Sequence, residues 1–400
     1  MNQRLAALLF IFITGASTAA VVLSCSTAQH ADVRIIMGTG GATIYNERTD
    51  RARERAVDDA LHSLVHASYH DGKGRSFYGT LEPFIDIRTS GIVTNWKILR
   101  QKEEDGTYYV QLRGAVNLSI RDTVTGNCLQ KYSPTVLLLV HEVEGDEDRS
   151  AEKTVSYPVM TASIRSNDFD VIDYSAALSK TENAKSLFES SMGTTVLTQN
   201  RTEFMDRIGA DVLVIGTVTI SDQTGLLEEY DTPMQSRRAV VNLRSVDVYT
   251  GKILASVSEN AAGVHADSTM ASHRGVENCI GTSSVFGTDD DRKGVFLQQT
   301  LTEYLHLLSS REYTIIIQNG KEGSAETLLD DLIGSTNRVV SAQPMKEVDG
   351  NPAVRIVFSG TTDDLAGIFT SSDTGLTTRY TVDETSPGTV SVSVKQQPTS

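Results

Sequence analysis

Three histidines recur at every fourth residue within one predicted helix, a spacing that could support metal chemistry. His62, His66 and His70 occupy positions i, i+4 and i+8, so a helix would place them on one face. Imidazoles in such an array can bind a transition metal or titrate near neutral pH. The His-Glu-x-x-His order of zinc hydrolases is absent. We expect a solvated polar face that points away from Leu61 and Leu64, with a surface metal or pH-sensitive site as the alternative.

Other short motifs match a known chemistry only in part. Ser150 and Lys153 fit Ser-x-x-Lys, but the accompanying Ser-Asp-Asn and Lys-Thr-Gly are missing. The glycines within 38–41 lack a P-loop lysine, so we expect them to permit close backbone approach or a bulge. The acidic run 289–291 lacks the EF-hand pattern. We therefore predict no catalytic residues, no cofactor, no resident metal and no enzymatic activity. A hydrolase site assembled from distant residues is the lowest-ranked alternative.

The histidines belong to a first segment that predicts one helix and three strands. An apolar stripe at three- and four-residue spacing predicts a helix over Glu47–Tyr69. A strand over Val33–Ile44 precedes it and enters a glycine-rich turn. A hairpin turn at Glu104–Gly106 joins strands over Ile92–Gln101 and Tyr108–Ile120. Together these elements predict a small α+β domain.

The middle segment predicts long strands and one long polar stretch. Strands are expected over Thr135–Val143, Asp211–Ser221 and Arg238–Tyr249, and a closing helix over Val295–Leu308. Gly263–Asp291 is polar without a clear period, and we interpret it as a loop long enough to be functional. The shorter predicted elements are a helix starting at Pro158, a strand over Asp170–Tyr174, one or two helices over Ala184–Gly209 and a strand over Lys252–Ser258.

The last segment, from Tyr313 to Lys395, predicts the order β-α-β-β-α-β-β. Strands that repeatedly feed helices indicate mixed sheets covered by helices. The predicted fold class is therefore α+β, with three mixed α/β-sheet domains after a signal peptide. The predicted division is a signal peptide over 1–24 and domains over 25–131, 132–310 and 311–400.

Composition excludes some classes of function. The chain has 36 Lys+Arg against 51 Asp+Glu, a formal net charge of −15, so we expect no nucleic-acid partner. Hydrophobic residues make up 39% and charged residues 22% of the chain, as in folded soluble proteins rather than disordered ones. The three cysteines cannot all pair, so a disulfide scaffold is excluded.

The amino terminus has the pattern of a secretory signal. A short positive start precedes an apolar run over Leu5–Ile13 and a series of small residues. Val22-Leu23-Ser24-Cys25-Ser26 then resembles a relaxed bacterial lipobox, which predicts acylation of Cys25 and attachment to a membrane. The alternative is ordinary cleavage near 26–28, which would release a periplasmic protein. We expect Cys128 and Cys279 to remain separate thiols.

Three motifs in the first segment resemble a family of envelope proteins. GTGGAT precedes RARERAVDDAL, and the runs Ser90–Leu99 and Asp105–Val110 follow in order. Over about residues 32–120 this pattern is similar to the amino-terminal domain of the flagellar assembly protein T family and its small outer-membrane lipoprotein relatives. The third segment departs from that family, whose own third domain is a small β-barrel.

The middle segment is similar to a second fold. Ile208–Val218 and Val246–Ala255 resemble two strands of the TolB amino-terminal and curli-secretion (CsgG-like) lipoprotein fold, over about residues 135–310. Curli-secretion relatives form a pore from long hairpins of alternating lipid-facing residues. Neither Gly263–Asp291 nor Leu227–Arg237 shows that alternation, so we predict no pore.

These resemblances imply a lipid-anchored bacterial scaffold or assembly protein of the cell envelope. We expect attachment to the outer membrane through Cys25, on the periplasmic face rather than the cell surface. The expected partners are envelope proteins, either of a flagellar machine or copies of the chain in a self-assembled ring. The alternative is a ligand- or host-binding lipoprotein that uses the 263–291 loop.

Overall fold

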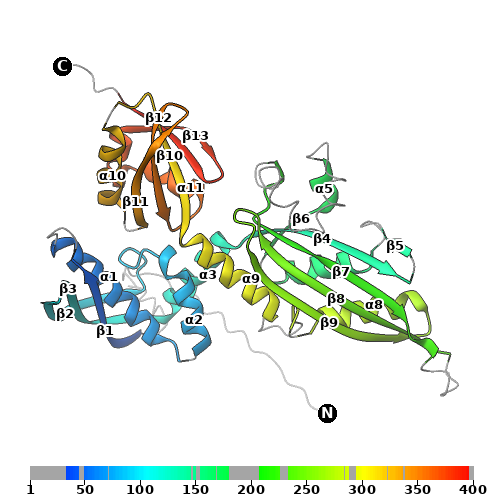
Figure 1. The fold of residues 1–400 in the computed structure, drawn as a ribbon. Coiled ribbons are helices and arrows are strands. Elements are labelled where there is room, and N and C mark those ends of the chain that lie inside the picture. The colour runs from blue at the N-terminus through cyan, green and yellow to red at the C-terminus, as the bar shows by residue number, and fades with distance from the viewer. Residues whose placement is uncertain are drawn as a thin grey trace, which may run out of the picture.

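A computed structural model shows three separate β-sheets with helices packed on them (Figure 1). The predicted α+β class is confirmed. The structure describes residues 33–44, 49–70, 72–145, 147–149, 154–167, 169–179, 207–225, 233–282, 284–287, 294–321, 323–336 and 338–395. Cys25, the Ser150–Lys153 motif, the acidic run 289–291 and nearly all of the helices expected over Ala184–Gly209 lie outside these residues.

The first sheet has the order β1-β3-β2 and is antiparallel throughout. Helix α1 covers one of its faces, and the hairpin turn between β2 and β3 has positive φ at Asp105 and Gly106, as a tight hairpin requires. The predicted strands, hairpin and helix are confirmed, but the glycine-rich turn is not, because those glycines lie inside β1. The bounds are β1 Val33–Thr43, α1 Thr49–Ser68, β2 Val93–Glu104 and β3 Thr107–Asn117.

The glycines of β1 allow α1 to approach its backbone closely. A Cβ on Gly38 would lie 2.3 Å from the carbonyl oxygen of Ala60, and one on Gly40 would lie 2.3 Å from that of Ala56. No real Cβ tolerates such distances, so the expectation of close backbone approach is confirmed. Because side chains alternate along a strand, even-numbered residues of β1 face α1 and odd-numbered residues face away.

Two helices of this region have no counterpart in the sequence expectations. Helix α2 (Gly72–Leu81) begins at glycines that favour a turn, but Tyr78 and Leu81 are fully buried and hold it in place. A short 3₁₀ helix, η1 (Glu82–Phe84), follows it. Helix α3 (Leu118–Tyr132) begins at Asn117, whose side chain accepts a hydrogen bond from the Ile120 N–H.

The second sheet has the order β5-β4-β7-β8-β9, with the short β6 pairing β4. Strand β4 pairs β7 in parallel, whereas β7, β8 and β9 form an antiparallel meander. The strand bounds are β4 Thr135–Glu144, β5 Glu147–Arg149, β6 Asp170–Ile172, β7 Val212–Asp222, β8 Gln235–Asp247 and β9 Ile253–His265, and the helix bounds are α4 Ser156–Arg165, α5 Tyr174–Ser179, α8 Ser268–Ile280 and α9 Val295–Leu308.

The predicted loop over Gly263–Asp291 is wrong. Strand β9 continues to His265, and α8 then packs on β8 and β9, starting at Asp267, whose side chain accepts from the Met270 N–H. Small side chains line the contact, and a Cβ on Gly263 would lie 2.2 Å from the carbonyl oxygen of Ala271. The buried face of α8 contains only two large apolar side chains, Val276 and Ile280, and its other buried residues are small, so the segment resembles a polar loop in sequence.

The third sheet has the order β11-β12-β10-β14-β13. Its elements follow the predicted order β-α-β-β-α-β-β. Positive φ at Asp349 and Gly350 forms the hairpin between β11 and β12. The bounds are β10 Arg311–Gln318, α10 Ser324–Ser335, β11 Val339–Val348, β12 Asn351–Phe358, α11 Thr362–Thr370, η5 Ser372–Thr374, η6 Leu376–Thr378, β13 Tyr380–Ser386 and β14 Thr389–Val394.

Buried side chains form one continuous cluster across the first and second sheets. It runs from α1 through α3 and β4 to α9, whereas the third sheet has a cluster of its own. The division into three domains with the stated boundaries stays a prediction. Among the described residues, none of the helices combines the length and apolarity needed to span a bilayer.

The contact between β1 and α1 predicts a large cost for adding one methyl group. We expect Gly38→Ala to lower the free energy of unfolding by about 1–3 kcal/mol, because the backbone of α1 must move to admit a Cβ. Gly126→Ala, in α3, is the matched control: its Cβ would meet nothing within 4 Å, and we expect no loss of stability. Urea unfolding of both variants measures the difference, and equal stability would contradict the tight contact.

Candidate functional site

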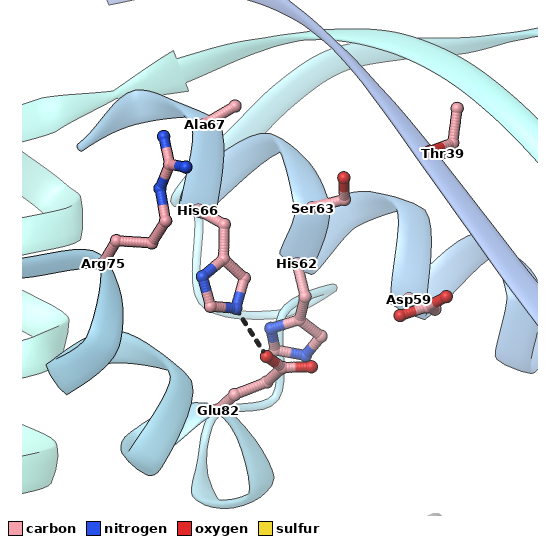
Figure 2. A pocket seen from close by; sticks show the side chains of 8 residues that line it. All are labelled: Thr39, Asp59, His62, Ser63, His66, Ala67, Arg75 and Glu82. Carbon is pink, nitrogen blue, oxygen red and sulfur yellow. Dashed lines mark hydrogen bonds and ion pairs between the residues drawn. The ribbon is translucent and has the colours of Figure 1, made fainter. Parts of the chain in front are cut away.

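Two of the three histidines line an open pocket between α1, α2 and β1. Figure 2 shows His62 and His66 on α1, with Glu82 facing them from the segment that follows α2. The pocket has a volume of roughly 420 Å³. Its lining residues are Thr39, Asp59, His62, Ser63, His66, Ala67, Arg75 and Glu82.

The histidines form hydrogen bonds inside the protein rather than a solvated face. His62 is only 8% exposed, and its Nδ1 lies 2.9 Å from the buried Tyr78 hydroxyl. His66 is half-buried, with its Nε2 2.8 Å from Glu82 Oε2. The expected solvated face is therefore wrong for these two residues, because α2 and η1 cover it. His70 is exposed as expected, and it contacts Arg34 instead.

The pocket does not bring together a metal-binding set. His70 lies apart from the other two imidazoles, whose partners are a phenol and a single carboxylate. Across the described ranges, no group of three His, Cys, Asp or Glu side chains could hold a metal ion. The structure therefore gives no support to the metal alternative at His62, His66 and His70.

Burial sets the protonation of the groups behind the pocket. Desolvation lowers the pKa of His62, although the nearby Glu82 and Asp58 oppose this shift. Desolvation also raises the pKa of the Tyr78 phenol well above its ordinary value. At neutral pH the pair is therefore a neutral imidazole bonded to a neutral phenol. This pair and the hydrogen bond between His66 and Glu82 attach α2 and the following η1 to α1, which is a structural role.

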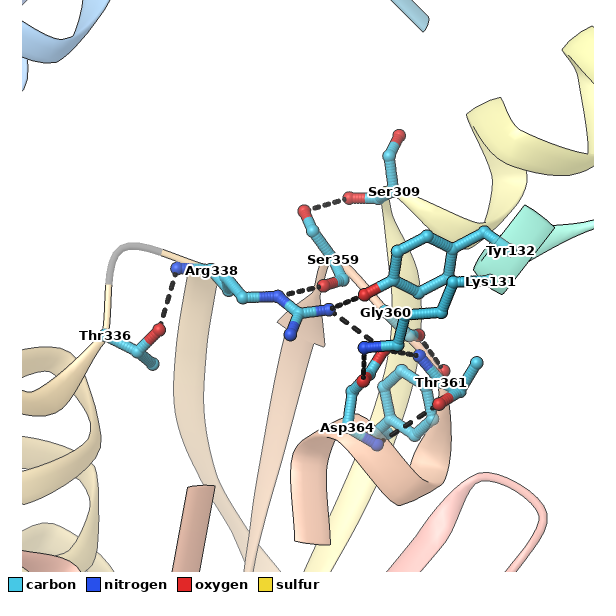
Figure 3. Close-up of polar contacts among 10 residues, drawn as sticks. Lys131, Tyr132, Ser309, Thr336, Arg338, Ser359, Gly360, Thr361 and Asp364 are labelled. Atoms are coloured by element: carbon cyan, nitrogen blue, oxygen red, sulfur yellow. Dashed lines mark hydrogen bonds and ion pairs between the residues drawn. The ribbon is translucent and has the colours of Figure 1, made fainter. Parts of the chain in front are cut away.

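A network of charged residues joins the third sheet to helix α3 (Figure 3). Lys131 Nζ donates to Asp364 Oδ1 at 2.8 Å, and Arg338 donates to Asp364 Oδ2 at 3.0 Å and to the Tyr132 hydroxyl at 3.1 Å. The Arg338 Nε also donates to the carbonyl of Ser359 at 2.8 Å. Residues more than two hundred positions apart thus meet at one carboxylate. We term these residues (Lys131, Tyr132, Arg338, Asp364) the α3 joint.

The surroundings of Asp364 favour its charged form. Burial raises its pKa, but the hydrogen bond from Lys131 and the charge of Arg338 outweigh burial, and the pKa falls to about 2. Asp364 also completes a capping box with Thr361 at the start of α11. The Asp364 carboxylate therefore stays ionised across the physiological pH range.

A second ion pair joins the second sheet to the third. Asp247 is fully buried at the end of β8, and Arg311, the first residue of β10, donates to its Oδ1 at 3.0 Å. The Thr250 backbone N–H and hydroxyl donate to the other carboxylate oxygen. The Arg311 guanidinium stacks 4.5 Å from the ring centroid of Tyr249. Both links to the third sheet thus depend on a buried or half-buried carboxylate.

The two cysteines that the structure describes are separate, buried thiols, as predicted. Burial raises the pKa of Cys128 and of Cys279 to about 11. Both are therefore protonated at neutral pH, and neither has the lowered pKa of a reactive cysteine.

Comparison with known proteins identifies no family. No family model and no curated protein matches the chain. Solved structures that resemble part of it include a lipoprotein from Neisseria meningitidis, at 16% identity over 34% of this chain and 86% of that one, with a TM-score of 0.23. Others are a hypothetical protein from Chlamydia trachomatis (13%, 33% and 73%, TM-score 0.22) and a secreted protein from Helicobacter pylori (12%, 32% and 70%, TM-score 0.13). At such TM-scores the likeness carries no argument about this chain.

Sequence reasoning found the histidines but missed the residues that matter most to the assembly of the sheets. The α3 joint involves ordinary surface residue types with no local motif. Its one sequence signal is the capping pattern Thr361-x-x-Asp364, which marks a helix start but not a partner on α3. Such long-range pairing becomes visible only once the fold is known.

The burial of His62 predicts a pH dependence of stability. The unfolded chain protonates His62 near pH 6.5, whereas the folded chain protonates it only at lower pH. The free energy of unfolding should therefore fall as the pH drops below about 6.5, by no more than about 1.4 kcal/mol per pH unit. Urea unfolding between about pH 7 and pH 5 should show a shallower slope for His62→Gln, whereas a control at the exposed His306 should keep the wild-type slope. Equal slopes in all three proteins would contradict this assignment.

The α3 joint predicts a specific loss on removing one carboxylate. Asp364→Asn should lower the free energy of unfolding by roughly 1–3 kcal/mol, because Arg338 and Lys131 lose their common partner. The Asp364 contribution should be complete above about pH 3.8 and should disappear as the pH falls through about 2. Thermal unfolding at pH 7 measures the loss. Asp363→Asn, on the same helix turn, is the control and should change little.

Proposed function

We propose that the protein is a lipid-anchored scaffold of the bacterial cell envelope that acts by binding rather than by catalysis. The observation that carries the proposal is the lipobox-like run Val22–Ser26 after an apolar signal segment. Acylation of Cys25 would hold the folded body at a membrane surface, since each buried methylene adds about 0.8 kcal/mol of membrane affinity.

The joints between the sheets support a scaffold role. One core spans the first two sheets, and the third is attached to them through the α3 joint and the Asp247–Arg311 pair. A body connected in this way holds its sheets at fixed positions for partners. In the pocket lined by His62 and His66, the two imidazoles bond to Tyr78 and Glu82 rather than to Ser63, the serine among the lining residues.

The more specific part of the proposal concerns location and partners. We infer attachment to the outer membrane on its periplasmic face, with envelope proteins as partners in a flagellar machine or a self-assembled ring. The resemblance of the first two segments to flagellar assembly protein T and CsgG-like domains supports this part. The ligand-binding alternative is weakened, because much of its predicted 263–291 loop is helix α8, packed on β8 and β9.

Cys25 predicts how the protein distributes between membrane and soluble fractions. In a bacterial host with lipoprotein processing, the wild-type chain should incorporate labelled palmitate and sediment with membranes, because the acylated terminus inserts into the bilayer. Cys25→Ala should lose the label entirely and shift most of the protein to the soluble periplasmic fraction. Ser24→Ala keeps a small residue before the cysteine and is the control that should remain labelled. An unlabelled wild-type protein would refute the anchor.

A further inference from the structure

The face of the first sheet opposite α1 carries a row of exposed apolar side chains. Val33, Ile35 and Met37 are 45%, 64% and 62% exposed. They alternate along β1 because the even-numbered residues, including Gly38, are held against α1. Three large apolar side chains in one row at the edge of a sheet indicate a surface that contacts a partner.

Strand pairing places basic side chains beside this row. Met37 is opposite Arg113, which in turn is opposite Lys97, so these three side chains share a face. One step along the sheet, Arg100 lies opposite Gln111 on the same face. The outward face thus has an apolar row on β1 and a group of cations on β3 and β2. We term this set (Val33, Ile35, Met37, Lys97, Arg100, Arg113) the basic–apolar face.

The three cations of this face are unpaired within the described part of the chain. Lys97, Arg100 and Arg113 form no ion pair there, although the whole chain has a net charge of −15. The acidic side chains Glu103–Asp105 gather at the hairpin end of the same strands, where Glu104 pairs with Lys102. Charges further away than about 8 Å are largely screened at physiological ionic strength. The local positive charge therefore determines what this face attracts.

We propose that the basic–apolar face lies on the headgroups of an anionic phospholipid membrane. Clustered Lys and Arg side chains attract negatively charged headgroups, and neighbouring apolar side chains enter the boundary between headgroups and acyl chains. A second copy of the chain is a poorer occupant, because two such faces would bring like charges together. An anionic membrane offers headgroups that pair with the cations and acyl chains that bury the apolar row.

The position of the face relative to Cys25 strengthens this assignment, and this step rests on the proposed function. Val33, at the start of the apolar row, is the eighth residue after Cys25. Eight residues span at most about 27 Å even when fully extended. An acylated Cys25 would therefore keep this face within reach of the bilayer. Anchor and face together would fix how the body is oriented on the membrane, which a single flexible anchor cannot do.

The test separates the face from the anchor by using the mature chain from residue 25 with Cys25→Ser, which cannot be acylated. It is mixed with vesicles of phosphatidylcholine, with or without phosphatidylglycerol, and binding is measured by co-sedimentation. We expect binding only with phosphatidylglycerol, and a strong decrease in about 1 M salt.

Two triple variants remove the same charge from opposite sides of the first sheet. Lys97→Gln, Arg100→Gln and Arg113→Gln together should weaken binding about a hundredfold. Arg51→Gln, Arg53→Gln and Arg55→Gln on α1 should leave it nearly unchanged. Ile35→Ser with Met37→Ser should also weaken binding, because the apolar row then no longer enters the boundary between headgroups and acyl chains. Unchanged thermal unfolding of each variant confirms that it folds.

Several outcomes would overturn the proposal. Equal losses in the two triple variants would show that total charge, not this face, determines binding. Equal binding to vesicles without phosphatidylglycerol would remove the role of the cations. Self-association that the face variants abolish, without vesicle binding, would assign the face to a second copy. Palmitate labelling of the wild-type chain is scored separately, so loss of the anchor and loss of the face are distinguishable.

Discussion

The backbone contact between β1 and α1 is the constraint on which the first sheet depends. Gly38 and Gly40 bring the strand against carbonyl groups of the helix, so α1 cannot rotate or slide without a clash. A shift of the strand by one residue would exchange its faces and bury the odd-numbered side chains. The contact therefore fixes both the burial of α1 and the outward direction of Ile35 and Met37. The absence of side chains at Gly38 and Gly40 on the face toward α1 thus determines which side chains are exposed on the opposite face.

The sequence predicted the elements whose burial depends on large apolar side chains. The strands over Thr135–Glu144 and Val212–Asp222, the helix α1 and the whole order of the third sheet follow from such patterns. The strand over Val33–Thr43 was also predicted, although most of its large apolar side chains face outward. Helix α8 was not predicted because most of its buried residues are small, with only Val276 and Ile280 large. Helix α2 was not predicted because its glycines favour a turn, whereas the burial of Tyr78 holds it as a helix. The direction of the histidines was wrong for a related reason, since a helix that was not predicted covers them.

For the site residues too, the sequence predicted contacts within one helix but not contacts with residues far along the chain. A spacing of four residues correctly placed His62 and His66 on one face of α1, but their partners Tyr78 and Glu82 come from a segment for which the sequence predicted no helix or strand. Contacts between residues hundreds of positions apart, such as Lys131 with Asp364, have no signature in a single sequence. The outward face of the first sheet is only partly readable from the sequence. The alternation of apolar residues along β1 is visible there, but the strand pairing that places Arg113 and Lys97 beside them is not.

Helix α9 runs into β10 with only Ser309 and Ser310 between them. Its length is packed beside the second sheet and near α2, and the Ser309 carbonyl accepts a hydrogen bond from the Ser359 hydroxyl at 2.6 Å. The helix is thus clamped at its far end by the third sheet and along its side by the other two. A rotation of the third sheet would therefore turn α9 with it. A force that a bound partner exerts on the third sheet would then be transmitted through α9 to the first sheet, because the connection contains no flexible hinge.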